Sequence, residues 1–247
     1  MPRLRQASIH AGLIFLLLTT AACSPDSSSP QQKVSLHTET AAAETLLDEI
    51  DALERQLTAV RDINEIKRLQ RAYGYYIDRS QWDQVVDLLT DDATAEYGNA
   101  GIYAGKESVR ALLYGVGYGE LGLQPQQLRE HIQLQPVITL SEDGLGAKGR
   151  WRGFVILGQY EEYARWQEGP YENEYRKEDG VWKISKIRWK ENFTVPFDGG
   201  WTTVMEQTNV ADRTFPAADF PPSQIHEPWP SVSQLPYHYP NPVSGEE

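Results

Sequence analysis

The sequence predicts an α+β protein in which helices lie on one face of an antiparallel sheet. The first half of the chain carries apolar residues at helical spacing, and the second half carries longer segments with strand-like alternation. Turns at Asp143-Gly144 and Asp179-Gly180 separate the later segments as hairpins do. A block of helices followed by strands that such turns connect is typical of the α+β class.

Residues 1–22 predict a secretory signal. Two arginines precede the apolar run 11–18, which is too short to be a stable membrane anchor. The stretch 18–23, Leu-Thr-Thr-Ala-Ala-Cys, resembles a bacterial lipobox, with Thr20 where that motif usually has Leu. The resemblance implies cleavage before Cys23, lipid on its thiol, and export to the periplasmic side of a bacterial membrane. An internal start codon would instead leave the protein cytoplasmic.

Composition excludes several classes of function. Cys23 is the only cysteine, so the mature domain has neither a disulfide nor a thiolate for metal binding or catalysis. Without the two signal arginines, the chain has 21 basic and 35 acidic residues, a net charge of −14. This charge repels phosphate backbones and argues against a nucleic-acid partner.

The segment after the signal predicts a tether and then a helix. Residues 23–42 contain few apolar side chains and are expected to be flexible. From Leu46 to Val60, apolar residues recur at spacings of 4, 3, 4 and 3, which predicts an amphipathic helix over 43–60. Its apolar stripe could pack on the domain or on a second copy of the chain.

The domain itself is expected over residues 61–195 and begins with two more helices. Asp62 is suited to cap a helix whose apolar face runs from Ile63 to Tyr76. Ser80 is suited to start a short helix that ends near Leu89, with a turn at 90–92.

Strands and a proline-rich tail follow. A short hairpin is expected over 93–104, a helix over 106–114, and a Gly-rich loop, a possible lid, over 115–123. The longer predicted strands are 129–140, 146–159, 171–177 and 181–193. The prolines of the tail 196–247 exclude regular structure, and we expect this tail to lie along the domain or a neighbouring subunit.

One carboxylate stands at the joint between two predicted helices. Asp78 has the aromatic side chains of Tyr73, Tyr76 and Trp82 close to it in the sequence. It either faces solvent, which is ordinary for an aspartate, or faces an apolar pocket, where desolvation and a partner would shift its pKa.

One imidazole stands in a predicted strand. Alternation places His131, Gln133 and Gln135 on one face, and Ile132 and Leu134 on the other. The row of polar side chains faces either solvent or a polar-lined cavity.

Several motifs between residues 60 and 195 resemble one known family. The main motifs are Tyr73-x4-Asp78-x3-Trp82-Asp83, Leu88-Leu89-Thr90-Asp91-Asp92-Ala93, Gly101-x-Tyr103-x-Gly105-Lys106, Gln135-Pro136-Val137-Ile138, Ala147-Lys148-Gly149-Arg150-Trp151-Arg152, Tyr171-Glu172-Asn173-Glu174-Tyr175 and Asp179-Gly180-Val181-Trp182-Lys183. Together they resemble the SnoaL-like branch of the nuclear transport factor 2-like superfamily. The resemblance implies a cone-shaped, curved antiparallel sheet around the N-terminal helices, one deep apolar pocket, and a homodimer or homotrimer.

The resemblance also assigns candidate catalytic residues. Asp78 and His131 match the carboxylate and imidazole shared by scytalone dehydratase, the bile-acid dehydratases and hexachlorocyclohexane dehydrochlorinase. Tyr73 matches a catalytic tyrosine of the bile-acid enzymes, and Tyr97 matches a water-positioning tyrosine of scytalone dehydratase. The second pocket histidine of scytalone dehydratase has no counterpart in residues 149–154, which puts the hydration-type chemistry of that one enzyme in doubt here and leaves the pair of Asp78 and His131 intact.

These residues suggest a lyase or isomerase without a cofactor or metal. His131 would be the base, Asp78 would orient it, and Tyr73 and Tyr97 would donate hydrogen bonds to a leaving group or an oxyanion. The candidate substrate-binding residues are Trp82, Trp151, Phe154, Tyr171 and Tyr175, whose number suits an aromatic substrate.

Two further readings follow from the resemblance. Some lyases of the superfamily act on lignin-derived diaryl compounds and release water and formaldehyde. Other members are non-catalytic modules that bind small molecules or mediate assembly. The sequence leaves this alternative open.

Overall fold

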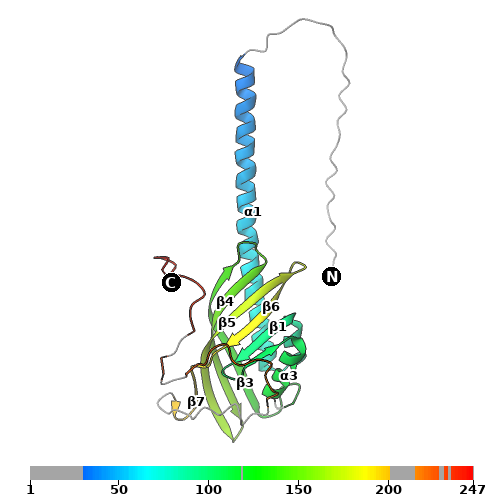
Figure 1. Ribbon diagram of the computed structural model, residues 1–247, viewed down its shortest axis with the longest axis vertical. Coiled ribbons are helices and arrows are strands. Elements are labelled where there is room, and N and C mark those ends of the chain that lie inside the picture. The colour runs from blue at the N-terminus through cyan, green and yellow to red at the C-terminus, as the bar shows by residue number, and fades with distance from the viewer. Residues whose placement is uncertain (1–29, 118, 201–214, 228–230, 233–234, 247) are drawn as a thin grey trace. The chain divides into compact units, whose positions relative to one another are not determined.

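The computed structural model describes residues 30–117, 119–200, 215–227, 231–232 and 235–246. The chain divides into two compact units, Met1–Ala52 and Leu53–Glu247, and the second contains the sheet (Figure 1). The predicted signal peptide and Cys23 lie outside the described ranges. Within those ranges, no helix is both long and apolar enough to cross a membrane.

Helix α1 spans Pro30–Asp78 without the break that the sequence predicted at Asp62. Asp62 caps no helix: its carboxylate accepts hydrogen bonds from Lys177 Nζ at 2.6 Å and from Trp182 Nε1 at 2.9 Å. The predicted tether was also wrong from Pro30 onward, because these residues are helical. No proline or glycine interrupts the chain between Pro30 and Gly74, so nothing in the backbone breaks the helix.

The apolar stripe of α1 is exposed. Leu53, Leu57 and Val60 are 62%, 50% and 57% exposed, whereas Ile66 and Tyr73 are fully buried in the same unit. At 100° per residue, these two sets point in nearly opposite directions around the helix axis. The part of α1 that belongs to the second unit therefore packs on the domain with its other face, and the stripe does not pack on it.

Two short helices follow. The first, α2, spans Trp82–Asp87, and α3 spans Lys106–Val116. The predicted Ser80 cap was wrong, because Gln81 holds the N-cap position and Ser80 has a left-handed φ of 51°. Gly117, directly after α3, lies against Trp82 so closely that a Cβ would come within 2.6 Å of the indole.

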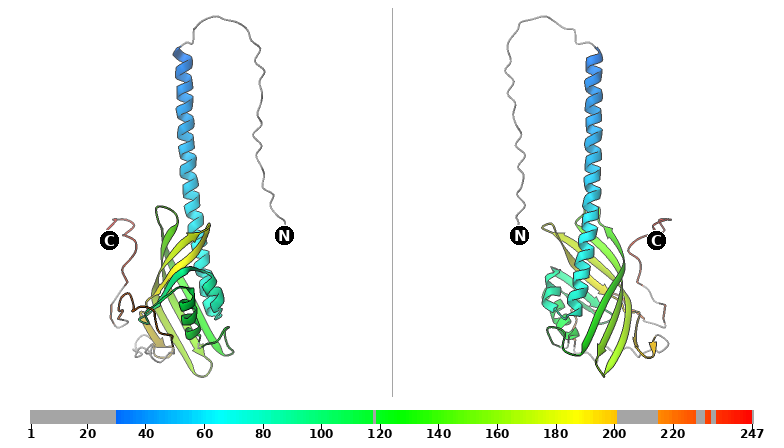
Figure 2. Two further views of the ribbon diagram at one scale, coloured as in Figure 1. Left: turned by 45° about the vertical axis from the view of Figure 1, so that its right-hand side comes forward. Right: turned by 180° about the vertical axis from the view of Figure 1, so that it is seen from behind.

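The strands form one mixed sheet. Their bounds are β1 Leu89–Tyr97, β2 Ile102–Ala104, β3 Gln127–Leu140, β4 Gly146–Gln159, β5 Tyr163–Glu178, β6 Val181–Trp189 and β7 Phe193–Pro196. The order is β2-β1-β6-β5-β4-β3, with β7 paired to β5. Figure 2 shows the sheet curving around the lower part of α1. The predicted α+β class is confirmed, but β1 and β6 run parallel, so the sheet is not wholly antiparallel.

Three strand boundaries differ from the prediction. Strand β5 begins at Tyr163, eight residues before Tyr171, and the predicted segment 181–193 divides into β6 and the start of β7. The expected turn at 90–92 lies within β1. There Asp91 pairs with Lys106 at 2.9 Å, and Asp92 pairs with Arg176.

The described part of the C-terminal tail lies on the domain. Ile102 and Phe220 form an isolated bridge, and Tyr103 donates a hydrogen bond to the carbonyl of Pro216 at 2.8 Å. A buried ion pair lies beneath the tail, with Lys190 Nζ 2.6 Å from Glu96. Further along, His238 Nδ1 lies 2.8 Å from the Glu172 carboxylate.

Candidate active site

Asp78 and His131 are in direct contact, as predicted. Oδ1 of Asp78, at the end of α1, accepts a hydrogen bond from the backbone N–H of His131 at 2.6 Å and lies 3.1 Å from its Nδ1. Both side chains are largely buried, with exposed fractions of 9% and 15%. One carboxylate oxygen therefore fixes both the main chain and the ring of the imidazole.

This contact sets the tautomer and the charge of His131. A carboxylate only accepts hydrogen bonds, so Nδ1 carries the proton and the lone pair is on Nε2. Burial lowers the pKa of His131, and the hydrogen bond and charge of Asp78 partly oppose this. The imidazole is therefore neutral near pH 7 and has a basic nitrogen.

The joint after Asp78 is held by backbone hydrogen bonds. Ser80 donates its N–H to Ile77 at 3.0 Å, which turns the chain out of α1. The Gly-rich loop then binds the joint, since the N–H of Gly122 donates to Ser80 and that of Leu123 to Arg79, both at 2.9 Å. These bonds fix the position of the carboxylate.

The polar row on β3 is only partly as predicted. His131 and Gln133 share the inner face, and Gln133 accepts a hydrogen bond from Gln70 of α1 at 2.7 Å. Gln135 does not share it: its φ is 50°, the register shifts between Leu134 and Val137, and its side chain accepts a bond from exposed Arg152. The bulge thus turns Gln135 to the outer face.

Three tyrosines form a second polar cluster. The hydroxyl oxygens of Tyr73 and Tyr97 lie 2.7 Å apart, and the ring of Tyr171 meets that of Tyr73 edge-on at 6.2 Å. Burial raises the pKa of Tyr97 to about 12 and raises that of Tyr73 well above its usual value. Both hydroxyls keep their protons at neutral pH and can donate hydrogen bonds.

A single cavity brings these groups together. Its lining includes Tyr73, Tyr97, His131 and Tyr171. Asp78 is absent from the lining, consistent with a place behind the imidazole. Asp78 orients His131 as a base through their hydrogen bond, and the tyrosines supply hydrogen-bond donors within the same cavity.

Four of the five predicted substrate-binding aromatics do not line this cavity, and only Tyr171 does. Trp82 lies under the Gly-rich loop and donates a hydrogen bond to the carbonyl of Glu120 at 2.7 Å. The ring centres of Phe154 and Trp166 lie 5.0 Å apart. Alternation along β4 puts Phe154 on the face of the sheet opposite to that of Val155, which lines the cavity.

Trp151 and Tyr175 belong to the buried core instead. The indole N–H of Trp151 donates to the Tyr175 hydroxyl at 2.9 Å, and that hydroxyl donates to Gln70 at 2.6 Å. These hydrogen bonds satisfy the polar atoms of the two aromatics within the protein, so their role is structural.

The tail supplies a second imidazole to the cavity, which no pattern in the sequence predicted. His226 lines the cavity and is 5% exposed. Asn99 holds its backbone with two hydrogen bonds, of 3.0 and 3.1 Å. Burial and the charge of Lys190 lower the pKa of His226, and a hydrogen bond to the backbone of Glu191 partly opposes this lowering. This residue lies in an aperiodic proline-rich segment, where no spacing marks it.

Within the described ranges, no group of three or more His, Cys, Asp or Glu side chains is placed to hold a metal ion.

The fold and the site define a class: a small α+β domain whose curved sheet and helices enclose a ligand cavity. The family model for the SnoaL-like domain matches residues 58–188, more than half of the 247 residues. The chain belongs to the SnoaL-like domain family.

Solved structures agree with this assignment. The hexachlorocyclohexane dehydrochlorinase of type 3 from Novosphingobium barchaimii has 21% identity and a TM-score of 0.51, with 58% of this chain and 95% of that chain covered. A protein provisionally named scytalone dehydratase, from Novosphingobium aromaticivorans, has 20% identity and a TM-score of 0.50, with 57% and 90% covered. At these identities the likeness shows the fold alone.

Proposed function

We propose that this protein is a cofactor-independent lyase or isomerase that acts on a hydrophobic, aromatic small molecule. The single observation that carries the proposal is the contact between Asp78 and His131 at the wall of the cavity. Two similar structures are named as a dehydratase and a dehydrochlorinase, and both names describe eliminations.

The proposed reaction begins with proton abstraction. Nε2 of His131 takes a proton from a substrate carbon, and the electrons of that C–H bond form a double bond as the leaving group departs from the neighbouring carbon. Asp78 stabilises the imidazolium that forms. Tyr73 or Tyr97 donates a hydrogen bond to the departing oxygen, and the imidazolium returns the proton to it, which releases water. In the isomerase variant, the imidazolium returns the proton to another carbon.

The test is turnover of a library of aromatic alcohols, including diaryl alcohols of the lignin type, with product mass as the readout. An elimination removes the mass of water, and a lignin-type cleavage also removes that of formaldehyde. The His131→Ala and Asp78→Asn variants should lose turnover and keep ligand binding. Unchanged turnover in either variant would refute the assignment of the base.

The alternative is a non-catalytic module, and the exposed stripe of α1 favours a role in assembly. A helix with apolar residues at heptad spacing is complementary to a second copy of itself. We propose that Leu53, Leu57 and Val60 hold two or three copies of the chain together.

This proposal is tested by the mass of the protein in solution. Leu57→Lys should reduce the mass to that of one chain, because it puts a charge into the proposed interface between copies. Tyr160→Lys is a matched control, because Tyr160 is 65% exposed in the turn between β4 and β5 and is not part of the stripe. A Leu57→Lys variant with the mass of the unchanged oligomer would refute the interface.

Export and lipidation at Cys23 are a further proposal, which rests on the signal-like sequence. In a bacterial host, the protein should fractionate with membranes and carry lipid on Cys23. Cys23→Ser should release it, and a soluble unmodified product of the native gene would refute the proposal.

A further inference from the structure

Strand register aligns two arginines on the inner face of the sheet. Arg129 of β3 lies opposite Leu157 of β4, and Leu157 lies opposite Arg165 of β5. All three side chains line the cavity. Neighbouring strands are about 4.8 Å apart, so the two arginine backbones lie about 10 Å apart on either side of Leu157.

The next inward-facing row contains the proposed base. His131 lies opposite Val155, and Val155 lies opposite Gln167, and all three also line the cavity. Two residues along a strand span roughly 7 Å. The arginine row is thus one side-chain layer away from His131 within the same cavity.

Arg165 packs against an aromatic ring at the cavity. Its guanidinium lies 4.5 Å from the ring centre of Tyr163, which also lines the cavity. Among the residues that the structure describes, no carboxylate pairs with Arg165. An arginine stacked on an aromatic ring keeps its planar set of donors for a carboxylate ligand.

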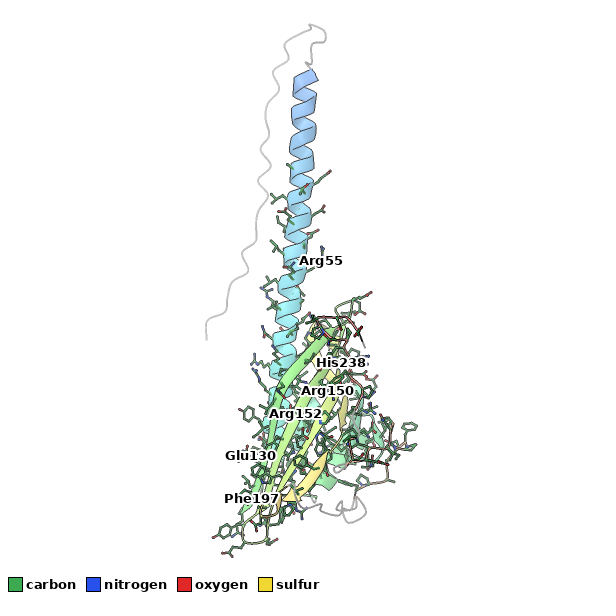
Figure 3. All side chains as sticks on the ribbon, turned by 90° about the vertical axis from the view of Figure 1, so that its left-hand side faces the viewer. Arg55, Glu130, Arg150, Arg152, Phe197 and His238 are labelled. Atoms are coloured by element: carbon green, nitrogen blue, oxygen red, sulfur yellow. The ribbon has the colours of Figure 1, made fainter. Side chains whose placement is uncertain are left out.

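Arg152, on the other face of the sheet, is different. It pairs with Glu168 at 2.6 Å and donates to Gln135 at 2.9 Å. Figure 3 shows Arg150 and Arg152 on the face of the sheet that is turned to the viewer. Arg150 also pairs with a carboxylate, that of Glu172.

The other charges of the cavity are consistent with an acidic ligand. Arg129 lies over the ring of Trp82 at 5.3 Å, and its charge contributes to the lowered pKa of His131. Glu191 adds one negative charge to the lining, from the segment that follows β6. The backbone of Glu191 lies beside Gly169 of β5, four residues along that strand from Arg165.

We propose that the cavity binds an aromatic carboxylate, with the acid group on Arg165 and the reactive carbon one layer further along the strands, at His131. The inference rests on the proposed function for the role of His131, and it adds the substrate class. Arg129 contributes positive potential from the opposite side of Leu157. A neutral aromatic alcohol would leave Arg165 without the charge partner that its position favours.

The test is calorimetric binding of two probes with the full chain, naphthoate and the uncharged naphthamide of nearly equal shape. We expect naphthoate to bind at least about tenfold more tightly, equivalent to about 1.4 kcal/mol. Arg165→Gln should remove this preference and leave naphthamide binding unchanged, which also shows that the variant is folded. Arg152→Gln, the same substitution on the outer face, should keep the preference.

Two results would overturn the proposal: equal binding of the two probes by the native chain, or an undiminished preference in Arg165→Gln. Should Arg165→Gln fail to fold, salt supplies the second measurement. Added salt should weaken naphthoate binding and spare naphthamide, and equal effects on both probes would count against an ionic contact. His131→Ala should lose turnover and keep the acid preference, so failure of the proposed reaction and failure of the acid site give different results.

Discussion

The substitution Asp78→Asn tests the reasoning about the site most directly. Both hydrogen bonds from His131 go to the same carboxylate oxygen, at 2.6 and 3.1 Å. An asparagine can present its amide oxygen in that place and keep both bonds. The substitution therefore removes the negative charge while it leaves the acceptor and the packing.

The expected loss follows from the charge on the imidazolium. Two unit charges about 4 Å apart attract by about 4 kcal/mol at an effective dielectric constant of about 20. Each 1.36 kcal/mol or so of barrier is tenfold in rate, so loss of the whole attraction would lower kcat by about 10³. A retained neutral hydrogen bond is worth about 1 kcal/mol, so we expect a decrease of about 10² to 10³.

The assay is single-substrate turnover with the best alcohol found in the library, together with thermal unfolding and ligand binding. Asp83→Asn is the matched control, because Asp83 lies five residues away and pairs with Arg110 on the surface. Turnover of Asp78→Asn within threefold of the native rate would refute the role of the carboxylate. A collapse of thermal stability would show that Asp78 is chiefly structural.

Three further predictions concern pH, stability and the tyrosine cluster. Burial lowers the pKa of His131 below the usual 6.5, and the neutral imidazole is the active base. In the pH profile, kcat/KM should therefore decrease on the acid side only below pH 6.5. A decrease that begins above pH 6.5 would contradict this prediction. Glu96→Gln leaves fully buried Lys190 without its carboxylate and should lower the free energy of unfolding in urea by about 3 kcal/mol. Asp91→Asn, at a solvent-exposed pair, should lower it far less, and equal losses would contradict the assignment. Tyr73→Phe removes one donor and should lower kcat by about 10² or more at unchanged ligand affinity, and a change in affinity alone would indicate a binding role.

The contact between Asp78 and His131 could be predicted from the motif resemblance, whereas alternation alone left His131 facing either solvent or a cavity. Alternation on β3 gave His131 a face shared with Gln133, and the motif resemblance paired the imidazole with Asp78. Both patterns survive small errors in strand boundaries. The site core was therefore accessible before the fold was known.

The cavity walls could not be predicted by residue type alone. Trp151 and Phe154 stand three residues apart on one strand, so alternation forbids both from facing inward. Because β5 was expected to begin at Tyr171, residues 163–170 were not assigned to a strand, and Arg165 was not recognised as part of the cavity wall. Large aromatic side chains also fill cores, and only the fold separates a core aromatic from a wall.

Helix boundaries failed for a different reason. Asp62 and Ser80 have the chemistry of N-caps, but a cap forms only where the backbone already leaves the helix. Tertiary bonds from Lys177 and Trp182 use the Asp62 carboxylate instead. Such partners, more than a hundred residues away, leave no mark on the local pattern.

The tail that covers one side of the cavity has a practical consequence for anyone who shortens this protein. A chain that ends after Pro196 would contain every strand of the sheet, yet it would lack Phe215 and His226, which line the cavity. Water would enter where these side chains had been, and the better-solvated imidazole of His131 would titrate closer to a free histidine. Such a fragment would misreport the pH range in which the intact protein works.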